Sequence, residues 1–590
     1  MSERRKTRIV CTLGPAVDSV EQVKALLHAG MNVARFNFSH GNHAEHADRL
    51  QRLRGAARES GIPVATMLDT KGPEIRTGTL RGSREITVNV DDQITLTTEE
   101  IEGDSERLSV SYKQLPAEVE PGKRIYIADG LIELEVVSIE GSETHCVVRH
   151  GGTFGSRKNV NIPGVRVSLP AITDKDREDI VFAVQNGFDF IAASFIRKPE
   201  DVVQIQETVQ QYESPIMVIS KIEDQEGLDN IDAIIRVSAG VMVARGDLGV
   251  QLPTERIPLA QKRIIQKCNA ENKPVITATQ MLDSMIHNPN PTRAELTDVA
   301  NAIFDGTDAV MLSGETAAGR YPVRSVETMH RIAMSVEQSP EYRQRCRQYF
   351  ALERSAADIG HAVAKAAYVV AEQIDAAVIV TPTLRGNTPR ILSRFRPLQN
   401  IIAVTTSETT SRQLLLSWGV FPVLSEHVRD SELMLQNALK MAMKQDFVKR
   451  FDRVVTATGV PLNSPIPLNT IKVHFLGSIL NRGHRGFGAA AAGKITRADS
   501  AADAEARLKQ DGTEILLTRR IGTEHSRLIA SLRGVILEEN SSLSKEQLLE
   551  LNPQLVFIAE VPDALDQFEH GQFVSLDGEE KIIYEGSLEQ

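Results

Sequence analysis

The chain has 590 residues, a formal net charge of −11 and a pI near 5.8. An acidic chain lacks the excess basic charge of a dedicated nucleic-acid-binding protein, and no run of about 18 apolar residues predicts a membrane span. The four scattered cysteines have no metal-ligand spacing and are typical of reduced thiols. We therefore expect a soluble, cytoplasmic protein of several domains that binds neither nucleic acid nor membrane.

Short apolar runs alternate with helix-like segments such as Ser19–Ala29, Lys175–Gln185 and Leu259–Glu271 in the first part of the chain. The runs lack strict alternation, as expected for parallel strands buried on both faces. They are Arg8–Thr12, Asn32–Asn37, Val64–Leu68, Phe188–Phe195, Ile216–Ile222, Gly240–Ala244, Pro274–Ala278 and Asp308–Leu312. Eight strand–helix repeats favour a (β/α)8 TIM barrel, with an open doubly wound sheet as the alternative.

A segment of different character separates the third run from the fourth. Its alternating, β-rich stretches are Glu85–Val90, Gln93–Thr97, Arg124–Ile127, Ile132–Ile139 and Thr144–Val148. Because this insertion follows a strand, it would lie on the catalytic rim of a barrel. The pattern predicts a small β domain that acts as a lid.

A second α/β pattern begins after about residue 355. A helix over Ala356–Gln373 precedes the predicted strands Ala376–Thr381, Asn400–Thr405, Val420–Leu424, Arg453–Thr458 and Thr470–Phe475. The Gly/Ala/Arg-rich segment Gly483–Ser500 predicts a linker or an exposed loop. A last mixed domain follows, with predicted strands at Glu514–Leu517, Val535–Leu537, Leu555–Ile558 and Phe573–Leu576.

Charged residues follow the predicted barrel strands, at the rim where barrels carry out chemistry. Glu223 and Asp247 could supply oxygens to one Mg2+. Lys221 is two residues from Glu223 on a strand, so both side chains point to one side. A cation beside a metal-binding carboxylate suits stabilisation of a developing anion.

Other rim residues suit the binding of anions. Arg35, Arg76 and Lys158 could hold phosphates. Gly246 lets a backbone approach a ligand closely, and the free amides of a following helix would favour a carboxylate.

Several motifs in order resemble the pyruvate kinase family. They are RKTRIVCTLGP (5–15), NVARFNFSHG (32–41), LDTKGPEIRTG (68–78), KIE (221–223), MVARGDLGV (242–250), ITATQML (276–282), NPNPTRAE (288–295) and VMLSGETAAGRYP (310–322). The resemblance runs from about residue 5 to 325 and, more loosely, to about 474.

The resemblance implies a fold with four parts. Residues 1–70 and 171–345 would form the catalytic barrel, 71–170 an inserted β-barrel lid domain, and 346–474 an α/β allosteric domain. Residues 475–590 resemble the extra C-terminal domain of some bacterial members, itself similar to the phosphohistidine domain of phosphoenolpyruvate-utilising enzymes. Lys545 stands about where the phosphohistidine would fall, so we expect a structural or interface role there.

The resemblance also implies transfer of a phosphoryl group from phosphoenolpyruvate to ADP, giving pyruvate and ATP. Lys221, Thr279 and Arg35 would be catalytic, and the substrate would contact Arg35, Lys221, Gly246, Asp247 and Thr279. Arg76 and Lys158 would bind nucleotide phosphates. Mg2+ would be held by Glu223 and Asp247, and K+ by Asn37, Ser39, Asp69 and Thr70. In this family Glu74 accompanies dependence on K+.

A phosphorylated allosteric effector and a homotetramer are further implications of the resemblance. The effector loop would comprise Thr383, Arg385, Gly386, Asn387 and Thr388, between a strand and a helix, where backbone amides can cradle a phosphate. The partner loop, Gly459–Pro467, carries prolines where the family usually has glycines, which leaves the identity of the effector open.

Two alternatives to an active kinase stay open. One is a Mg2+-dependent lyase or aldolase of the phosphoenolpyruvate/pyruvate barrel group, against which the inserted lid, Lys158, Lys221 and the K+ set argue. The other is a non-catalytic metabolite-sensing homologue, which would be expected to have lost Lys221, Glu223 or Asp247. The immediate proton donor to the enolate is not identified.

Overall fold

A computed structural model describes residues 4–352, 358–426, 431–449, 452–460, 466, 468–476, 479–511 and 514–586. The chain divides into two compact units. The first comprises Met1–Gln373, Val378–Ala442 and Thr456–Lys472, and the second Ile374–Ala377, Met443–Val455 and Val473–Gln590.

Eight parallel strands close into a barrel in the order β1-β16-β15-β14-β13-β12-β3-β2. Their bounds are β1 (Arg8–Thr12), β2 (Val33–Asn37), β3 (Ala65–Asp69), β12 (Phe190–Ala193), β13 (Met217–Ile222), β14 (Gly240–Ala244), β15 (Val275–Ala278) and β16 (Ala309–Leu312). Nearly every strand residue is buried, which explains why the runs are continuously apolar. The predicted barrel is confirmed, and the open sheet is wrong.

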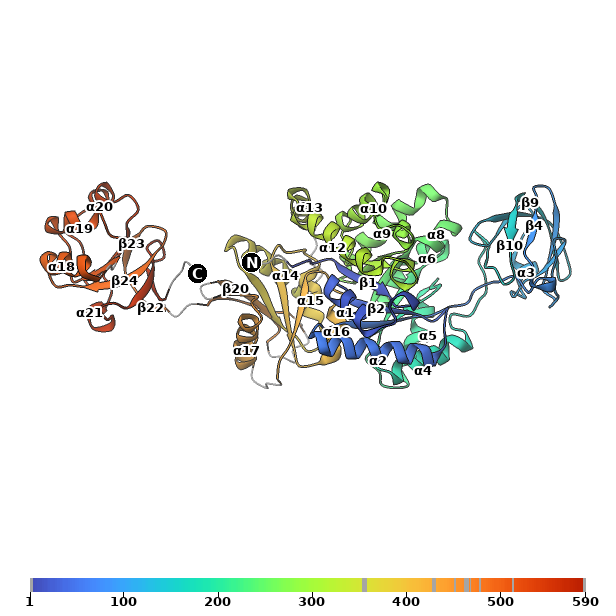
Figure 1. Cartoon of the computed structure of the whole chain (residues 1–590), viewed down its shortest axis with the longest axis horizontal. Coiled ribbons are helices and arrows are strands. Elements are labelled where there is room, and N and C mark those ends of the chain that lie inside the picture. The colour runs from blue at the N-terminus through green and yellow to red at the C-terminus, as the bar shows by residue number, and fades with distance from the viewer. Residues whose placement is uncertain are drawn as a thin grey trace. The chain divides into compact units, whose positions relative to one another are not determined.

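Helices surround the barrel strands, as Figure 1 shows. They are α1 (Val20–Ala29), α2 (His43–Ser60), α4 (Asp174–Gln185), α5 (Pro199–Gln210), α6 (Gln225–Asp229), α7 (Ile231–Val237), α8 (Arg245–Gln251), α9 (Ile257–Ala270), α10 (Arg293–Phe304), α11 (Gly314–Ala317), α12 (Pro322–Gln338) and α13 (Pro340–Leu352). Helix α1 begins with a capping box between Ser19 and Gln22 and ends at Gly30, whose φ of 118° is one that side chains disfavour. Such local signals set the helix limits within the barrel.

The insertion between β3 and β12 is built mainly of antiparallel strands around its own apolar core, and only β5 and β6 among its described strand pairs run parallel. A six-stranded sheet has the order β11-β7-β8-β9-β5-β6, and β10 pairs with β4. The elements are β4 (Ile86–Val88), β5 (Gln93–Thr97), β6 (Arg107–Ser109), α3 (Leu115–Glu118), β7 (Arg124–Ile127), β8 (Ile132–Glu140), β9 (Glu143–His150), β10 (Gly152–Phe154) and β11 (Val160–Asn161).

A five-stranded sheet follows with the order β19-β18-β17-β20-β21. Its elements are α14 (Ile359–Gln373), β17 (Val378–Pro382), α15 (Asn387–Ser393), β18 (Asn400–Thr405), α16 (Glu408–Leu414), β19 (Val420–Leu424), α17 (Ser431–Lys444), β20 (Arg453–Thr458) and β21 (Thr470–Phe475). Leu415 and Leu416, just after α16, share an apolar cluster with interior residues of the barrel such as Met67 and Ile219.

The last part of the chain forms an eight-stranded sheet, β22-β29-β28-β24-β25-β26-β27-β23. Its elements are β22 (Ile479–Arg482), β23 (Arg485–Phe487), β24 (Ala491–Arg497), α18 (Ala501–Asp511), β25 (Ile515–Thr518), α19 (Ser526–Ile529), β26 (Gly534–Leu537), α20 (Lys545–Leu551), β27 (Val556–Ala559), α21 (Ala564–Gln567), β28 (Phe573–Asp577) and β29 (Ile582–Glu585).

The prediction of a linker or loop over Gly483–Ser500 is wrong. This segment contains β23 and β24, and β24 pairs with β25 on one side and β28 on the other. Its glycines lie where backbones approach closely: a Cβ at Gly486 would meet Phe557 O at 2.9 Å, and one at Gly488 would meet Leu555 O at 2.7 Å. Glycine and alanine here serve strand packing and not chain flexibility.

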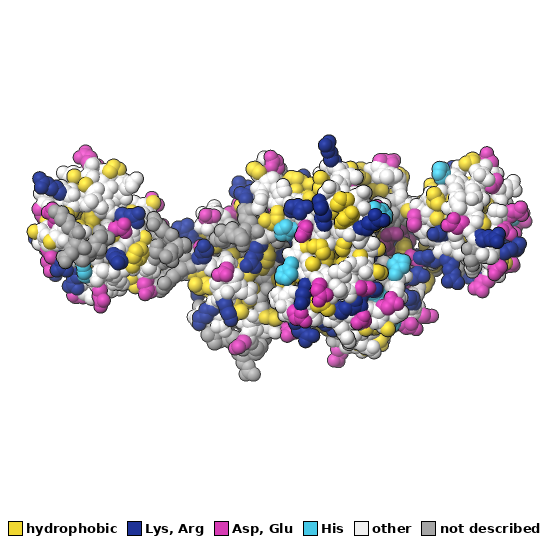
Figure 2. Space-filling model, in the orientation of Figure 1, with side chains coloured by type: hydrophobic (Ala, Val, Ile, Leu, Met, Phe, Trp, Pro, Cys, Tyr) yellow, Lys and Arg dark blue, Asp and Glu magenta, His cyan; other side chains and the backbone are white. Residues whose placement is uncertain are grey.

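Two observations concern nucleic-acid-binding and membrane-spanning proteins, the classes that the composition argued against. On the face of the barrel in Figure 2, basic and acidic side chains are interspersed. Among the described residues, no helix is both long and apolar enough to cross a bilayer.

Candidate active site

The carboxyl ends of β2, β3, β12 and β13 bring a buried charged cluster together at the barrel mouth. Arg35 Nε lies 2.6 Å from Asp69 Oδ2, and Lys221 Nζ lies 3.0 Å from Asp69 Oδ1. Lys221 Nζ also lies 2.9 Å from Glu223 Oε1. Arg35 is 8% exposed, Lys221 9% and Asp69 1%. Residues predicted from separate motifs thus form one ion-paired group.

The pairing sets the charge states of this cluster. Burial alone would lower the pKa of Lys221, but Asp69, Glu223 and Asp247 raise it above its ordinary value. Burial alone would raise the pKa of Asp69, but Arg35 and Lys221 lower it. The ammonium and the Asp69 carboxylate are therefore both charged at neutral pH.

Glu223 and Asp247 form a pair of neighbouring carboxyl groups. The pKa of Glu223 is raised to about 8, because burial and the nearby Asp247 together outweigh the opposing effect of Lys221. Burial also raises the pKa of Asp247, which lies at the more open edge of the site. Adjacent carboxylates that resist ionisation together are stabilised by a bound cation, so this donor set fits a hard divalent ion.

Two protein carboxylates leave room for other ligands around such an ion. Among the described residues, no group of three or more His, Cys, Asp or Glu side chains is arranged to hold a metal. A Glu223–Asp247 site would therefore need substrate oxygens or water to complete its coordination.

Thr279 and Gly246 lie together at the ends of β15 and β14. Gly246 N donates to Thr279 Oγ1 at 2.7 Å, and Thr279 has a φ of 65°. A β-branched residue at positive φ is uncommon and is characteristic of functional sites. Arg245 Nη2 donates to Thr279 O at 2.7 Å and Arg245 Nη1 pairs with Asp298, so this arginine holds the turn.

Asn37, Ser39, Asp69 and Thr70 lie at adjacent strand ends. Asn37 is the register partner of Asp69, and Asn37 Oδ1 accepts a hydrogen bond from Ser39 N at 3.1 Å. Thr70 is 5% exposed. These two strand ends therefore carry oxygen atoms that could coordinate a monovalent cation.

Arg76 and Lys158 meet on neighbouring segments at the base of the insertion. Thr77 N donates to Lys158 O at 2.7 Å, and residues 76 and 159 form a β-bridge. Arg76 Nη2 lies 2.6 Å from Glu74 Oε2, whereas Lys158 is exposed. Both cations thus lie on adjoining segments of the insertion, without the burial of Lys221.

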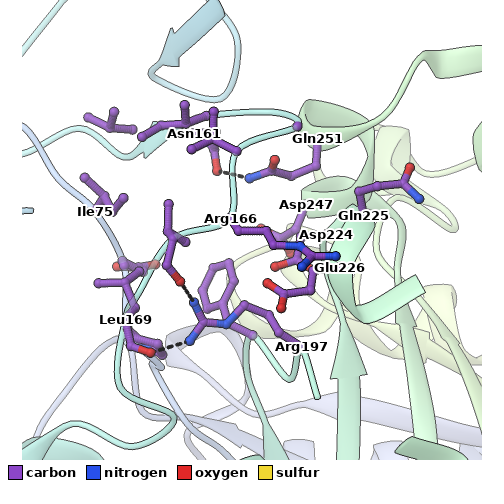
Figure 3. Close-up of a pocket in the computed structure, with 18 of the residues that line it drawn as sticks. Ile75, Asn161, Arg166, Leu169, Arg197, Asp224, Gln225, Glu226, Asp247 and Gln251 are labelled. Carbon is purple, nitrogen blue, oxygen red and sulfur yellow. Dashed lines mark hydrogen bonds between the residues drawn. The ribbon is translucent and has the colours of Figure 1, made fainter. Parts of the chain in front are cut away.

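A cavity of about 190 Å³ lies between the insertion and the barrel. Figure 3 shows Asp247, Asp224 and Arg166 facing it, with Asn161 bonded to Gln251 across it. The distance from Gln251 Nε2 to Asn161 Oδ1 is 3.1 Å.

The second linker of the insertion is also tied to the barrel. Arg197 donates to Val167 O at 2.7 Å and to Leu169 O at 2.6 Å. The insertion therefore has specific polar contacts with the barrel on both sides of the cavity.

The segment from Thr383 to Thr388 follows β17 and includes the first two residues of α15. Gly386 N donates to Thr383 Oγ1 at 2.9 Å, and Gly386 has a φ of 79°. Arg385 and Asn387 are exposed, while Thr388 is 4% exposed. Most of the partner loop, at 461–465 and 467, lies outside the described residues.

Sequence reasoning missed Ser194 and Arg245 as parts of this site. Ser194 follows β12 and its Oγ lies 2.6 Å from Lys221 Nζ. The signal for Ser194 was available, because it is the next-to-last residue of the fourth predicted strand. Arg245 stands inside a recognised motif, but its contacts with residues 278–281 depend on tertiary structure.

Comparisons with known proteins show the family to which the chain belongs. The family model "Pyruvate kinase, barrel domain" matches residues 4–326, and "Pyruvate kinase, alpha/beta domain" matches residues 361–474. Pyruvate kinases of Geobacillus stearothermophilus and Sporosarcina psychrophila are each 44% identical, covering 99% of both chains. A solved pyruvate kinase from Cryptosporidium parvum is 42% identical, with a TM-score of 0.76, and covers 80% of this chain and 96% of its own.

A closed barrel with charged groups at its mouth defines a TIM-barrel enzyme. The chain belongs to the pyruvate kinase family and is a phosphotransferase. Members of this family require a divalent metal and a monovalent cation, and their substrates and products are phosphoenolpyruvate, ADP, ATP and pyruvate. Because the relatives named above are pyruvate kinases, they give no support to the lyase or aldolase alternative.

Proposed function

We propose that this chain transfers the phosphoryl group of phosphoenolpyruvate to ADP at the mouth of its barrel, giving pyruvate and ATP. The observation that carries the proposal is the buried cluster in which Lys221 contacts Asp69 and Glu223. Phosphoryl transfer needs positioning and charge neutralisation more than covalent help from the protein. The cluster provides both.

Lys221 and Arg35 neutralise the charge of the transferring group. Lys221 acts on the phosphoryl group and on the enolate oxygen that is released, and Arg35 binds the phosphate. Both cations are held by Asp69 before substrate arrives, so little reorganisation accompanies the reaction. Gly246 and Asp247 position the substrate carboxylate, and Thr279 lies on the side where the enolate carbon is protonated.

Glu223 and Asp247 would hold Mg2+, and Asn37, Ser39, Asp69 and Thr70 would hold K+. These ions supply positive charge to the oxygens of phosphate, carboxylate and enol. The raised pKa of Glu223, caused by burial and the nearby Asp247, supports the divalent site. Glu74, which pairs with Arg76, accompanies the requirement for K+.

Arg76 and Lys158 bind the nucleotide phosphates at the base of the insertion, which acts as a lid. The short backbone link between Thr77 and Lys158 supports their joint action. The domains are 1–70 with 171–345 for the catalytic barrel, 71–170 for the lid, 346–474 for an allosteric domain and 475–590 for an extra C-terminal domain.

Regulation and assembly complete the proposal. A phosphorylated effector binds the loop of Thr383, Arg385, Gly386, Asn387 and Thr388, and the enzyme is a cytoplasmic homotetramer. The C-terminal domain resembles the mobile domain of phosphoenolpyruvate-utilising enzymes. It has no phosphoryl-carrier role, because Lys545 replaces the histidine and lies 5.4 Å from the Phe487 ring.

The test is pyruvate formation from phosphoenolpyruvate and ADP in a coupled assay. We expect turnover only when Mg2+ and K+ are both present, and no turnover when tetramethylammonium replaces K+. Binding of phosphoenolpyruvate without turnover, under all combinations of ions, would instead identify a non-catalytic metabolite sensor.

A further inference from the structure

Ser194 is a buried hydroxyl that joins two parts of the site. It follows β12 and is 3% exposed. Its Oγ lies 2.6 Å from Lys221 Nζ, 2.7 Å from Thr70 O and 3.4 Å from Asp69 Oδ1. None of the roles assigned above uses this side chain.

The direction of each hydrogen bond follows from donor and acceptor chemistry. An ammonium group only donates, a backbone carbonyl only accepts, and a serine hydroxyl has one proton. Lys221 Nζ therefore donates to Ser194 Oγ, and Ser194 donates its single proton to Thr70 O, the nearer acceptor. The Thr70 carbonyl thus sets the orientation of the lone pair that Lys221 uses.

The backbone holds Ser194 in this position. Ser194 N donates to Thr70 Oγ1 at 3.1 Å, so the two residues bond to each other twice. Gly72 has a φ of 71°, and a side chain there would meet Ser194 Cβ at 2.8 Å. Because glycine leaves this space to Ser194, the serine packs closely against the segment that follows β3.

The Thr70 carbonyl has two lone pairs, and Ser194 uses only one. In the proposed function the other would be available to the monovalent cation. A cation bound there would polarise the carbonyl, and the effect would pass through the Ser194 hydroxyl to the Lys221 ammonium. No further residue is needed between the Thr70 carbonyl and the Lys221 ammonium.

We propose that Ser194 is a positioning residue that couples monovalent-cation binding at Thr70 to the placement of Lys221. The inference rests on the proposed function for the roles of Thr70 and Lys221. Without the hydroxyl, the ammonium keeps only the carboxylates of Asp69 and Glu223, at 3.0 and 2.9 Å. It would then shift toward them and away from the transferring phosphate.

The test compares Ser194→Ala with a matched control, Ser325→Ala. Ser325 is 0% exposed and donates to Tyr321 O at 2.9 Å on α12, so the control also removes a buried hydroxyl bonded to a carbonyl. Each full-length variant is assayed for kcat, for KM of phosphoenolpyruvate and for the KCl concentration giving half-maximal rate. Melting temperature is also followed against KCl, with tetramethylammonium chloride as reference and no substrate present.

We expect Ser194→Ala to lower kcat by about tenfold to a hundredfold, the loss of one hydrogen bond to a charged group. The half-maximal KCl concentration should rise severalfold, while KM changes less than about threefold. The KCl-dependent rise in melting temperature should shrink, and a crystal structure should show Lys221 Nζ displaced toward Asp69. Ser325→Ala should match the wild type in its KCl dependence.

An unchanged KCl dependence in Ser194→Ala, with or without a lower kcat, overturns the coupling. A melting temperature that falls equally at every KCl concentration does the same, since it indicates a structural role alone. If the wild-type protein forms no pyruvate, the proposed function fails. The KCl-dependent melting and the position of Lys221 then still decide the role of Ser194.

Discussion

The cations at the barrel mouth and those at the lid base differ in how they are held. Arg35 and Lys221 are nearly buried and share Asp69, whereas the Arg76 side chain is 38% exposed and Lys158 is exposed. Desolvated and paired charges are fixed before substrate arrives, whereas exposed ones are screened by solvent. The comparison indicates a preorganised catalytic centre beside a nucleotide site that is completed on binding.

The largest effect is expected for Lys221→Met. Because this ammonium is the buried cation between two carboxylates, its loss should lower kcat by about a thousandfold or more. Phosphoenolpyruvate binding should change only a few-fold. Steady-state kinetics and equilibrium binding measure the two quantities.

The control for that substitution is Lys267→Met, which removes a half-exposed lysine paired with Asp232. Its kcat should match the wild type. Full activity of Lys221→Met would break the mechanism and, with it, the contrast between the two sets of cations.

A second large effect is expected for Asp69→Asn. The substitution leaves Arg35 and Lys221 without their shared carboxylate, and removing one partner of a buried ion pair costs about 3–5 kcal/mol. The free energy of unfolding, measured in urea, should fall by about this amount, and kcat should fall by about a hundredfold.

The matched variant is Asp232→Asn, which breaks the exposed pair with Lys267 and should cost less than about 1 kcal/mol. An equal decrease in the free energy of unfolding in both variants would mean that burial does not strengthen the ion pairs at the barrel mouth.

A smaller, nucleotide-specific effect is expected for Arg76→Ala and Lys158→Ala. Each should raise the KM for ADP by about tenfold while kcat changes only a few-fold, because these cations lie at the lid base. The effect should decrease as ionic strength rises.

Arg149→Ala serves as a control within the insertion, since Arg149 pairs with Glu135 on its surface. It should leave the KM for ADP unchanged. A lower kcat in Lys158→Ala without a change in the KM for ADP would indicate that Lys158 acts like the preorganised cations Arg35 and Lys221.

The smallest effect is a dependence of stability on pH through His46, which stacks on Phe38 behind the barrel mouth. Burial lowers the pKa of His46, and its Nδ1 is buried without a partner among the described residues. The neutral form is therefore favoured in the folded state.

Stability from His46 is present above the unfolded pKa of about 6.5 and is lost as pH falls through the lower folded pKa. Urea unfolding at pH 7.5 and pH 5.5 should show a loss at the lower pH that is reduced in His46→Gln. An equal loss in both proteins would show that other groups cause it.

Much of the barrel could be predicted from sequence. All eight strands were located, because parallel strands buried on both faces read as continuous apolar runs. In the insertion, β6, β10 and β11, which have two or three residues each, were missed. Strands β23 and β24 were missed because their glycines and alanines resemble a loop in sequence, although Gly486 and Gly493 lie in strands that leave no room for a Cβ.

For the candidate site, strand ends and motifs identified which residues stand at the rim but not which of them touch. Ser194 is the next-to-last residue of a predicted strand and Arg245 lies within a family motif, but the sequence indicated no role for either. Their contacts, with Lys221 and with the turn at Thr279, join residues 27 and 34 positions apart. Such contacts depend on barrel closure.

The sequence alone determined the family, the barrel and the types of residue at its mouth, because these follow from local patterns and ordered motifs. Tertiary structure decided which charges share a partner. Asp69 lies between Arg35 and Lys221 only because β2, β3, β12 and β13 close side by side. Charges that are distant along the chain acquire their pKa values and their chemistry from that proximity and burial.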